Sequence, residues 1–306
     1  MAAACLLLGG VASAFAGSDQ TWVARTGADT GACPITAPCK TFQYAYGQTN
    51  AKGVLSVLSS GEFGPLIIGK SISVVSERGE GAIVGANTWG SYGASIIVNG
   101  AGIEVKLRGL VIDPLVTPNY GIMLSNAKSL HIQDCKIRGG ELGIYVGGAS
   151  GGRAPGGDLY LSDTSVVGTR DIGIFIHPSS SGASMKVTME RVLVQNAATS
   201  GLSFFASGAT VNATIRNSVF SGNGYHGISA AQSGVTLMAD RVKLTNNSGG
   251  GVVATQGATV RIGDSVITGN AVGVNGYNGA TILTFGTNKI DGNQIDGTPN
   301  GTVALQ

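Results

Sequence analysis

The sequence has few charged residues and few aromatic ones. Among 306 residues, 12% are charged and 6% are aromatic, and the net charge is +2. An ordinary soluble domain is about a quarter charged, so charged helix faces do not form the solvent layer here. No basic cluster supplies the electrostatic footprint of a nucleic-acid-binding protein, and no nucleic-acid partner is predicted. The scarcity of aromatic residues leaves Val, Ile, Leu and Ala to build the core, which indicates a β-rich protein.

Glycine is abundant, with 50 residues, and it marks an internal repeat. A glycine followed by an apolar residue recurs every 22 to 30 residues, at Gly121, Gly143, Gly173, Gly201, Gly227, Gly251 and Gly273. Self-similarity at such a period is typical of a solenoid. The chain has no L-x-x-L-x-L frame, which argues against leucine-rich repeats.

Alternating apolar residues within each unit predict strands with one face inside. In the unit from Gly251, the residues expected inside are Val252, Ala254, Val260, Ile262 and Ile267, with Val253 and Arg261 outside. Such strands are too short to bury an apolar face alone, but they form continuous parallel sheets when stacked about 4.8 Å apart. A right-handed winding is expected. The register predicts one inward stack of Ile122, Ile144, Ile174, Leu202, Ile228, Val252 and Val274.

Polar residues recur at two corners of the repeat. One set follows the last strand of a unit and comprises Asn196, Asn223, Asn247, Asn270 and Asn293; the other lies between strands and comprises Asp134, Asp163, Asn217 and Asp264. Asn tolerates left-handed backbone geometry, and its amide can bond both the chain and a neighbour. We therefore predict stacked structural columns at these positions, including a ladder of amides, rather than catalytic residues.

The N-terminal residues 1–16 are apolar and end in Ala14-Phe15-Ala16, a small-x-small cleavage pattern. We expect a signal peptide, although the usual basic n-region is missing, and a buried N-terminal strand or helix remains the alternative. The run is too short for a comfortable membrane span of about 20 residues, so no transmembrane segment is predicted in the mature chain. The expected location is periplasmic, extracellular or at the cell surface.

Residues 17–52 are expected to cap the N-terminal end of a β-helix that occupies residues 53–306 in about ten coils. Residues 41–48 have the composition of a short amphipathic capping helix. Cys33 and Cys39 are close enough in sequence to form a disulfide in an oxidising compartment. Cys135 stands where other repeats carry Ser or Thr, and we expect a packed thiol.

The chain resembles a known family in three places. These are the motif Pro38-Cys-Lys-Thr-Phe42, the stretch at residues 61–72 and the repeated glycine-led coils. Together they resemble secreted bacterial right-handed parallel β-helix repeat proteins of the pectin-lyase-like superfamily, over essentially all of the mature chain. The resemblance implies an all-β, single-domain right-handed parallel β-helix. It leaves function open, because the superfamily contains lyases, hydrolases, esterases, tailspikes and adhesins.

Catalytic motifs of such enzymes are not recognisable. Glycoside hydrolysis needs paired carboxylates, yet the chain has no adjacent acids and no Asp-x-Asp; Tyr225-His226-Gly227 is its nearest approach to a Gly-His-Gly motif. We expect His226 to lie in the turn before a coil. A lyase would need acids for Ca²⁺ and a basic proton acceptor, for which Asp158, Asp163, Arg170 and Asp171 are candidates. No metal site is predicted otherwise, and Ca²⁺ is the cofactor only under this alternative.

The longest units begin at Gly143 and Gly173, and their extra residues predict loops beside one face. Tyr145 and Phe175 are expected as exposed neighbours there, suited to stacking on sugar rings; packing beneath the loops is the alternative. The candidate substrate-binding set is Tyr145, Phe175, Arg153, Asp158, Arg170, Asp171 and His177. The favoured hypothesis is an exported binding or structural surface for polysaccharide or cell-surface glycan. The alternatives are a polysaccharide lyase or glycoside hydrolase, and an adhesin, so enzymatic activity stays open.

Overall fold

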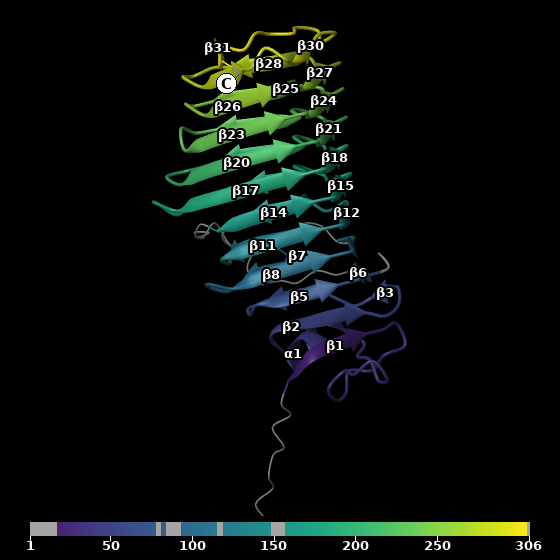
Figure 1. Ribbon diagram of the computed structural model, residues 1–306. Coiled ribbons are helices and arrows are strands. Elements are labelled where there is room, and N and C mark those ends of the chain that lie inside the picture. Colours follow the sequence, from purple (N-terminus) through teal and green to yellow (C-terminus); the bar gives the residue numbers. More distant parts are fainter. Residues whose placement is uncertain (1–16, 78–80, 84–92, 115–118, 148–156, 305–306) are drawn as a thin grey trace, which may run out of the picture.

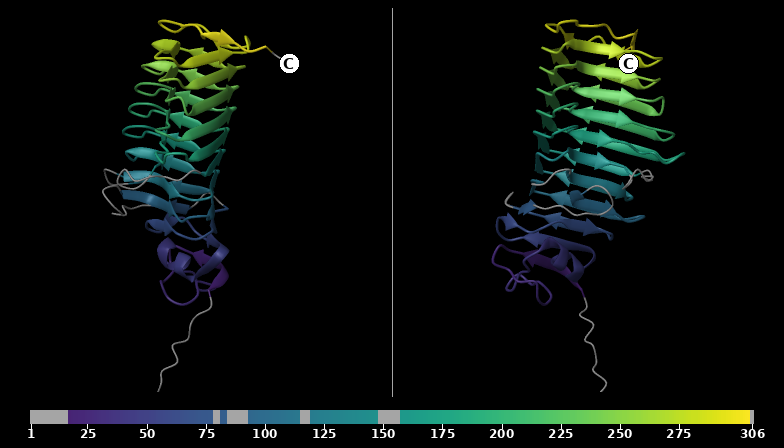
Figure 2. Two further views of the ribbon diagram at one scale, coloured as in Figure 1. Left: turned by 90° about the vertical axis from the view of Figure 1, so that its left-hand side faces the viewer. Right: turned by 180° about the vertical axis from the view of Figure 1, so that it is seen from behind.

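The computed structural model describes residues 17–77, 81–83, 93–114, 119–147 and 157–304. Over these residues the chain winds coil upon coil as a right-handed parallel β-solenoid, from the N-terminal end to the C-terminal end (Figure 1). Three parallel sheets, here called sheets A, B and C, run along the length of the molecule (Figure 2). The signal peptide predicted at residues 1–16 lies outside the described ranges.

The strands of each sheet come from successive coils. Sheet A has twelve: β1 (Ser18–Val23), β2 (Thr49–Val57), β5 (Ile72–Val75), β8 (Glu104–Arg108), β11 (Ser129–Gln133), β14 (Asp158–Ser162), β17 (Ser184–Glu190), β20 (Thr210–Arg216), β23 (Val235–Asp240), β26 (Thr259–Gly263), β29 (Thr281–Thr284) and β31 (Gly301–Thr302). Sheet B has ten: β3 (Gly61–Glu62), β6 (Gly81–Ile83), β9 (Leu110–Ile112), β12 (Lys136–Arg138), β15 (Ser165–Val167), β18 (Leu193–Gln195), β21 (Val219–Ser221), β24 (Lys243–Thr245), β27 (Val266–Thr268) and β30 (Lys289–Ile290). Sheet C has nine: β4 (Leu66–Ile68), β7 (Gly93–Asn99), β10 (Asn119–Asn126), β13 (Leu142–Val146), β16 (Ile174–Ile176), β19 (Leu202–Phe205), β22 (Ile228–Ala231), β25 (Gly250–Thr255) and β28 (Val272–Gly276).

The register agrees with the predicted inward stack. Each residue pairs with the next across sheet C, and all are buried: Ile122, Ile144, Ile174, Leu202, Ile228, Val252 and Val274. Strands β2 to β28 fall into successive triplets, one from each sheet, which makes nine three-stranded coils in the described residues, slightly fewer than the ten expected. One continuous hydrophobic core runs inside these coils, because each coil buries its apolar face on its neighbours.

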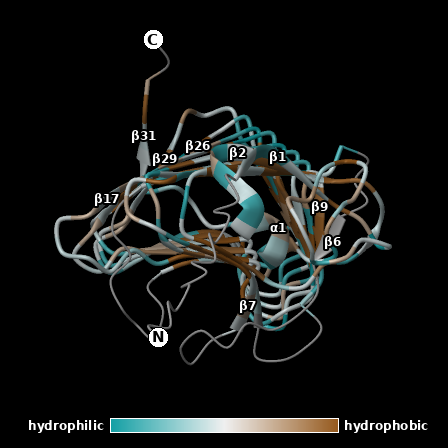
Figure 3. Ribbon diagram, turned by 90° about the horizontal axis from the view of Figure 1, so that it is seen from below, coloured by the Kyte–Doolittle hydropathy of each residue, from teal (hydrophilic) through white to brown (hydrophobic). Residues whose placement is uncertain are grey.

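A short helix closes the N-terminal end of this core. Helix α1 (Phe42–Gln48) crosses the opening between the sheets when the solenoid is viewed along its axis (Figure 3). The Thr41 side chain caps it by accepting from the Tyr44 N–H at 3.3 Å, and Phe42 packs edge-on against Phe63. Sheet A already begins within residues 17–52, where only a cap was expected. Strand β1 lies in this range and pairs with β2, which begins before Gly53. Nearby, Cys33 and Cys39 form a disulfide, with Cα atoms 5.0 Å apart.

The corner between sheets B and C contains a buried ladder of asparagine amides. Asn223 donates to Asn247, Asn247 to Asn270 and Asn270 to Asn293, each side-chain bond being 2.8 Å long. The prediction from the sequence that Asn196 belongs to this ladder is wrong. It is exposed at φ 54°, one position earlier in its turn, and the neighbouring Ala197 takes the ladder position, its N–H donating to Asn223.

The corner between sheets A and B is also a column, as predicted. Asp134, Asp163, Asn217 and Asp264 all have φ between 47° and 52°, which confirms a shared left-handed turn position. Arg191 and Arg241 take the same position in the intervening coils. Arg191 donates to both carboxylate oxygens of Asp163, at 2.5 and 2.8 Å, so opposite charges are stacked along this edge.

Candidate functional site

The outer face of sheet C brings together the predicted aromatic residues. Tyr145 pairs with Phe175 in register, and the column continues through Ser203, Ser229, Val253 and Asn275. Tyr145 and Phe175 are half-buried rather than fully exposed. Both pack against a second hydrophobic cluster on this face, formed by Ala94, Ile97, Tyr120, Met123 and Leu142. Met123 points outward as its register requires, yet it is wholly buried.

Five rings follow one another across this face and form what we call the aromatic stripe. Ring centroids are 5.2 Å apart for Tyr120 and Tyr145, and 5.8 Å apart for Tyr145 and Phe175. The imidazole of His177 lies 5.2 Å from Phe175 and 5.1 Å from Phe205. Each ring belongs to, or directly follows, a strand of sheet C, so the stacked coils hold the stripe rigidly. Tyr120 is buried, so the stripe offers accessible rings on the three consecutive coils that contain Tyr145, Phe175 with His177, and Phe205.

His177 adds a polar group to the stripe. Burial lowers its pKa below the ordinary value for histidine, so its imidazole is uncharged at neutral pH. A neutral imidazole can donate from one nitrogen and accept at the other. The stripe therefore combines apolar ring surfaces with a hydrogen-bonding group and no formal charge of its own.

Phe205 was missed in the sequence analysis. It lies two positions beyond Ser203, which follows Tyr145 and Phe175 in the outward column, and it is aligned with His177. The alternation in Leu202-Ser-Phe-Phe205 places Ser203 and Phe205 on the same side, so applying the period of two to the end of the strand indicates this residue.

The polar residues expected around these rings are distributed over different parts of the solenoid. Arg170 and Asp171 form the turn before β16, where their N–H groups donate to Gly140 and Glu141 of the preceding coil. The Asp171 carboxylate accepts from the Thr199 hydroxyl at 2.6 Å, a bond that fixes the turn.

Asp158 does not join the stripe. Asp158 begins β14 on sheet A, where its carboxylate accepts from the Tyr160 hydroxyl at 3.1 Å. Arg153 lies outside the described residues. Asp163 is engaged by Arg191, and within the described ranges no three His, Cys, Asp or Glu side chains gather as metal ligands would. The acids named for a Ca²⁺ site are thus not brought together there.

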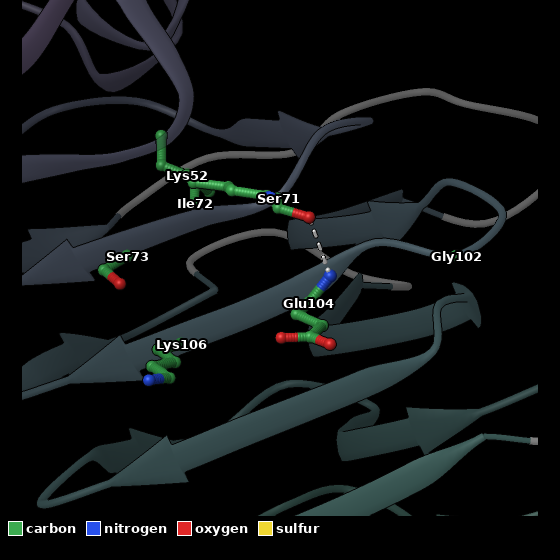
Figure 4. A pocket seen from close by; sticks show the side chains of 7 residues that line it. All are labelled: Lys52, Ser71, Ile72, Ser73, Gly102, Glu104 and Lys106. Carbon is green, nitrogen blue, oxygen red and sulfur yellow. Dashed lines mark hydrogen bonds between the residues drawn. The ribbon is translucent and has the colours of Figure 1, made fainter.

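Sheet A has a depression of its own near the N-terminal end. It measures about 410 Å³ and is lined by Lys52, Ser71, Ile72, Ser73, Gly102, Glu104 and Lys106 (Figure 4). The Glu104 N–H donates to the Ser71 hydroxyl at 3.0 Å, and the Glu104 carboxylate pairs with Lys128 at 2.5 Å. Both partners of that ion pair are more than half exposed, so solvent and salt screen it. This surface is open and charged, unlike the stripe.

A second hollow lies on the outer side of sheet C, toward the C-terminal end. It measures about 400 Å³ and is lined by Tyr225, His226, Gly249, Gly250, Val253, Val272, Asn275 and Tyr277. We call it the C-terminal hollow. It shares no residue with the stripe, so sheet C carries two separate aromatic surfaces.

Comparison with known proteins agrees with the architecture. A family model described as a right handed beta helix region matches residues 87–237 and 205–305. Among solved structures, the pectate lyase Pel9A is 14% identical with a TM-score of 0.66, covering 89% of this chain and 75% of that one. At this identity the likeness is one of fold.

Two further solved structures are less similar. The enzymatically active domain of bacteriophage CBA120 tailspike protein 2 is 11% identical with a TM-score of 0.45, covering 79% of this chain and 44% of that one. The A-module of the Azotobacter vinelandii mannuronan C-5 epimerase AlgE6 is 14% identical with a TM-score of 0.39, covering 82% and 89%. No curated protein sequence matches the chain. Within the described ranges, no helix has the length and apolar character needed to cross a membrane.

Proposed function

Because the chain belongs to the right-handed beta helix family, we propose that it is an exported surface protein that binds polysaccharide through the aromatic stripe. The observation that carries this proposal is the succession of ring contacts from Tyr120 to Phe205 across four coils. Aromatic faces present a large apolar area at little conformational cost, which suits the C–H faces of sugar rings. The named substrate of the pectate lyase with the same fold supports polysaccharide as the ligand class.

Tyr145 and Phe175 are only partly buried, so these rings can contact a ligand as well as pack against their neighbours. Both rings pack against the second hydrophobic cluster, which holds them in place, and part of each side chain remains accessible. Such fixed rings lose little freedom on binding, which reduces the entropic cost of association. His177 supplies a hydrogen-bonding group within the same surface.

Export is the second element of the proposal. It is supported by the apolar residues 1–16 with their small-x-small ending and by the Cys33–Cys39 disulfide, since structural disulfides persist in oxidising compartments. Edman sequencing of the protein recovered from the envelope or medium tests it. A mature N-terminus near Gly17 is the expected result, and retention of residues 1–16 in cytoplasmic protein contradicts it.

Phe205→Ala is the sharpest test of the binding surface. Phe205 is half-exposed and does not belong to the second hydrophobic cluster. It pairs in register with Ala231 of the next coil, so an alanine at position 205 would place the same residue type as its neighbour in this column. Native gels containing pectin, alginate, xylan or glucan should retard the wild-type protein. The variant should be retarded several-fold less, with an unchanged midpoint of thermal unfolding.

Tyr160→Ala serves as the matched control, because Tyr160 is a half-exposed aromatic residue on sheet A, away from the stripe. It should retain the retardation of the wild type. The proposal fails if no polysaccharide retards the wild type, or if Phe205→Ala and Tyr160→Ala lose retardation equally.

A further inference from the structure

The C-terminal hollow has two tyrosine walls that are open to solvent. Tyr225 is 57% exposed and Tyr277 is 46% exposed, which is unusual in a chain with so few aromatic residues. They come from different coils, Tyr225 from the turn before β22 and Tyr277 from the turn after β28. Exposed aromatic side chains that line a concavity are typical of a ligand site.

Two glycines create the space between these walls. A Cβ on Gly249 would lie 2.7 Å from the Tyr225 carbonyl oxygen and 2.9 Å from Nδ1 of His226. A Cβ on Gly250 would meet the Val253 side chain at 2.3 Å. The absence of side chains at these positions lets the His226 imidazole approach the backbone of the next coil.

The orientation and charge of His226 follow from that approach. Nδ1 accepts a hydrogen bond from the Gly250 N–H at 2.8 Å, which leaves Nε2 as the nitrogen that carries the proton. Burial lowers the pKa of His226 to about 4, so the side chain is uncharged at neutral and mildly acidic pH. The Tyr225 ring covers the imidazole, with centroids 3.7 Å apart.

A tight turn fixes the position of Tyr277. Asn278 and Gly279 have φ of 51° and 78°, and the Ala280 N–H donates to the Tyr277 carbonyl at 3.2 Å. Two consecutive positive φ values with an Asn-Gly pair are the signature of a type I′ turn. The Tyr277 N–H also donates to Ala254 at 3.1 Å, so this wall is anchored to the coil that contains Val253.

We propose that the C-terminal hollow binds a single uncharged sugar ring between Tyr225 and Tyr277. Val272 contributes apolar surface for the C–H face of the ring, and Val253, which is only 4% exposed, lies beneath it. Nε2–H of His226 and the Asn275 amide are hydrogen-bonding groups for the ring hydroxyls. Among the residues that the structure describes, no Asp, Glu, Lys or Arg lines the hollow, so none of them compensates the charge of a uronate or phosphate there.

This inference rests on the proposed glycan-binding role but uses none of the stripe residues. The two surfaces can therefore fail separately. Phe205→Ala tests the stripe, and binding at the C-terminal hollow should be unaffected by it. Tyr277→Ala tests the hollow, and Tyr277→Phe is its conservative control because the ring is retained.

Methyl-labelled NMR on the full mature chain gives a local readout. The wild type is titrated separately with cellohexaose, xylohexaose, mannohexaose and, as the charged comparison, hexagalacturonate. At least one neutral oligosaccharide should shift the Val253 and Val272 methyl resonances, and hexagalacturonate should shift them little. Tyr277→Ala should weaken the neutral ligand about tenfold, as expected for loss of one stacking wall, whereas Tyr277→Phe and Phe205→Ala should stay within about twofold.

The proposal is overturned if no neutral oligosaccharide moves these resonances or if hexagalacturonate binds there as well as the neutral ligands. Equal affinity of Tyr277→Ala and the wild type also overturns it. The comparison of neutral oligosaccharides with hexagalacturonate uses the wild type alone. It therefore still decides the proposal if Tyr277→Ala folds poorly.

Discussion

Asn247→Ala should destabilise the solenoid far more than its single side chain suggests. The Asn247 Oδ1 accepts from both the backbone N–H and the side-chain amide of Asn223, at 3.1 and 2.8 Å. Its own amide donates to Asn270 Oδ1 at 2.8 Å and to the Phe220 carbonyl at 3.2 Å. All three asparagines are at most 1% exposed, so water cannot replace the lost partners.

The cost follows from the groups left unpaired. Alanine leaves two buried donors of Asn223, one backbone and one side-chain, without an acceptor. Each unsatisfied buried group costs about 1–3 kcal/mol, so we expect a loss of about 3–5 kcal/mol in the free energy of unfolding. Of the two acceptors that lose the Asn247 amide, Asn270 Oδ1 adds little to this cost, because it still accepts from the Asn247 N–H at 3.0 Å.

The assay is urea denaturation followed by far-UV circular dichroism. Asn246→Gly is the matched control, because Asn246 is the exposed neighbour at φ 56°, a conformation that glycine adopts without strain. It should change stability by no more than about 0.5 kcal/mol. Hydrogen exchange should locate the loosened coils around residues 223–270 in the alanine variant.

An Asn247→Ala protein that unfolds at the same urea concentration as Asn246→Gly would refute this reasoning. It would mean that the ladder amides exchange their partners for water without cost. Destabilisation spread evenly over all coils would contradict the local character of the effect.

Three further predictions concern charge and redox state. Burial lowers the pKa of His226 from 6.5 to about 4, so between these pH values the unfolded chain is protonated at this residue and the folded chain is not. The free energy of unfolding should therefore fall as the pH drops from about 6.5 to 4. The unfolding midpoints of His226→Gln should lack this pH-dependent loss. Reducing the Cys33–Cys39 disulfide, which closes a short loop, should cost about 2 kcal/mol, measured by urea unfolding with and without reductant. Arg191→Ala should lower the thermal midpoint slightly in dilute buffer and hardly at all in molar salt, because its pair with Asp163 is largely exposed.

The inward stack and the turn columns were predictable because they depend on local rules. Alternation at period two requires only the residues of one strand, and the repeat multiplies the signal over many coils. The amide ladder was predicted with one error at Asn196. Its turn has Asn one position before the ladder residue, where other coils have Gly222 or Gly269, and spacing alone does not distinguish two adjacent turn positions.

The exposure of the outer faces was less predictable. Register placed Met123 and Tyr145 outside sheet C, and they are outside, but Met123 is fully buried and Tyr145 half-buried in a second cluster. Whether an outward residue meets solvent depends on neighbouring columns, here Tyr120 and Leu142, which do not follow from the alternation of one strand.

By itself the sequence determined the solenoid, its handedness, the core positions and the turn columns, because each coil repeats the same short-range pattern. Only the tertiary structure decided which outer residues meet. His226 and Gly250 are 24 residues apart and Tyr277 is further still, yet coil stacking brings them around one hollow. It likewise separates Asp158, on sheet A, from Tyr145 and Phe175, on sheet C. The physical reason is that repeat length, set by loops of variable size, fixes which residues become neighbours along the axis.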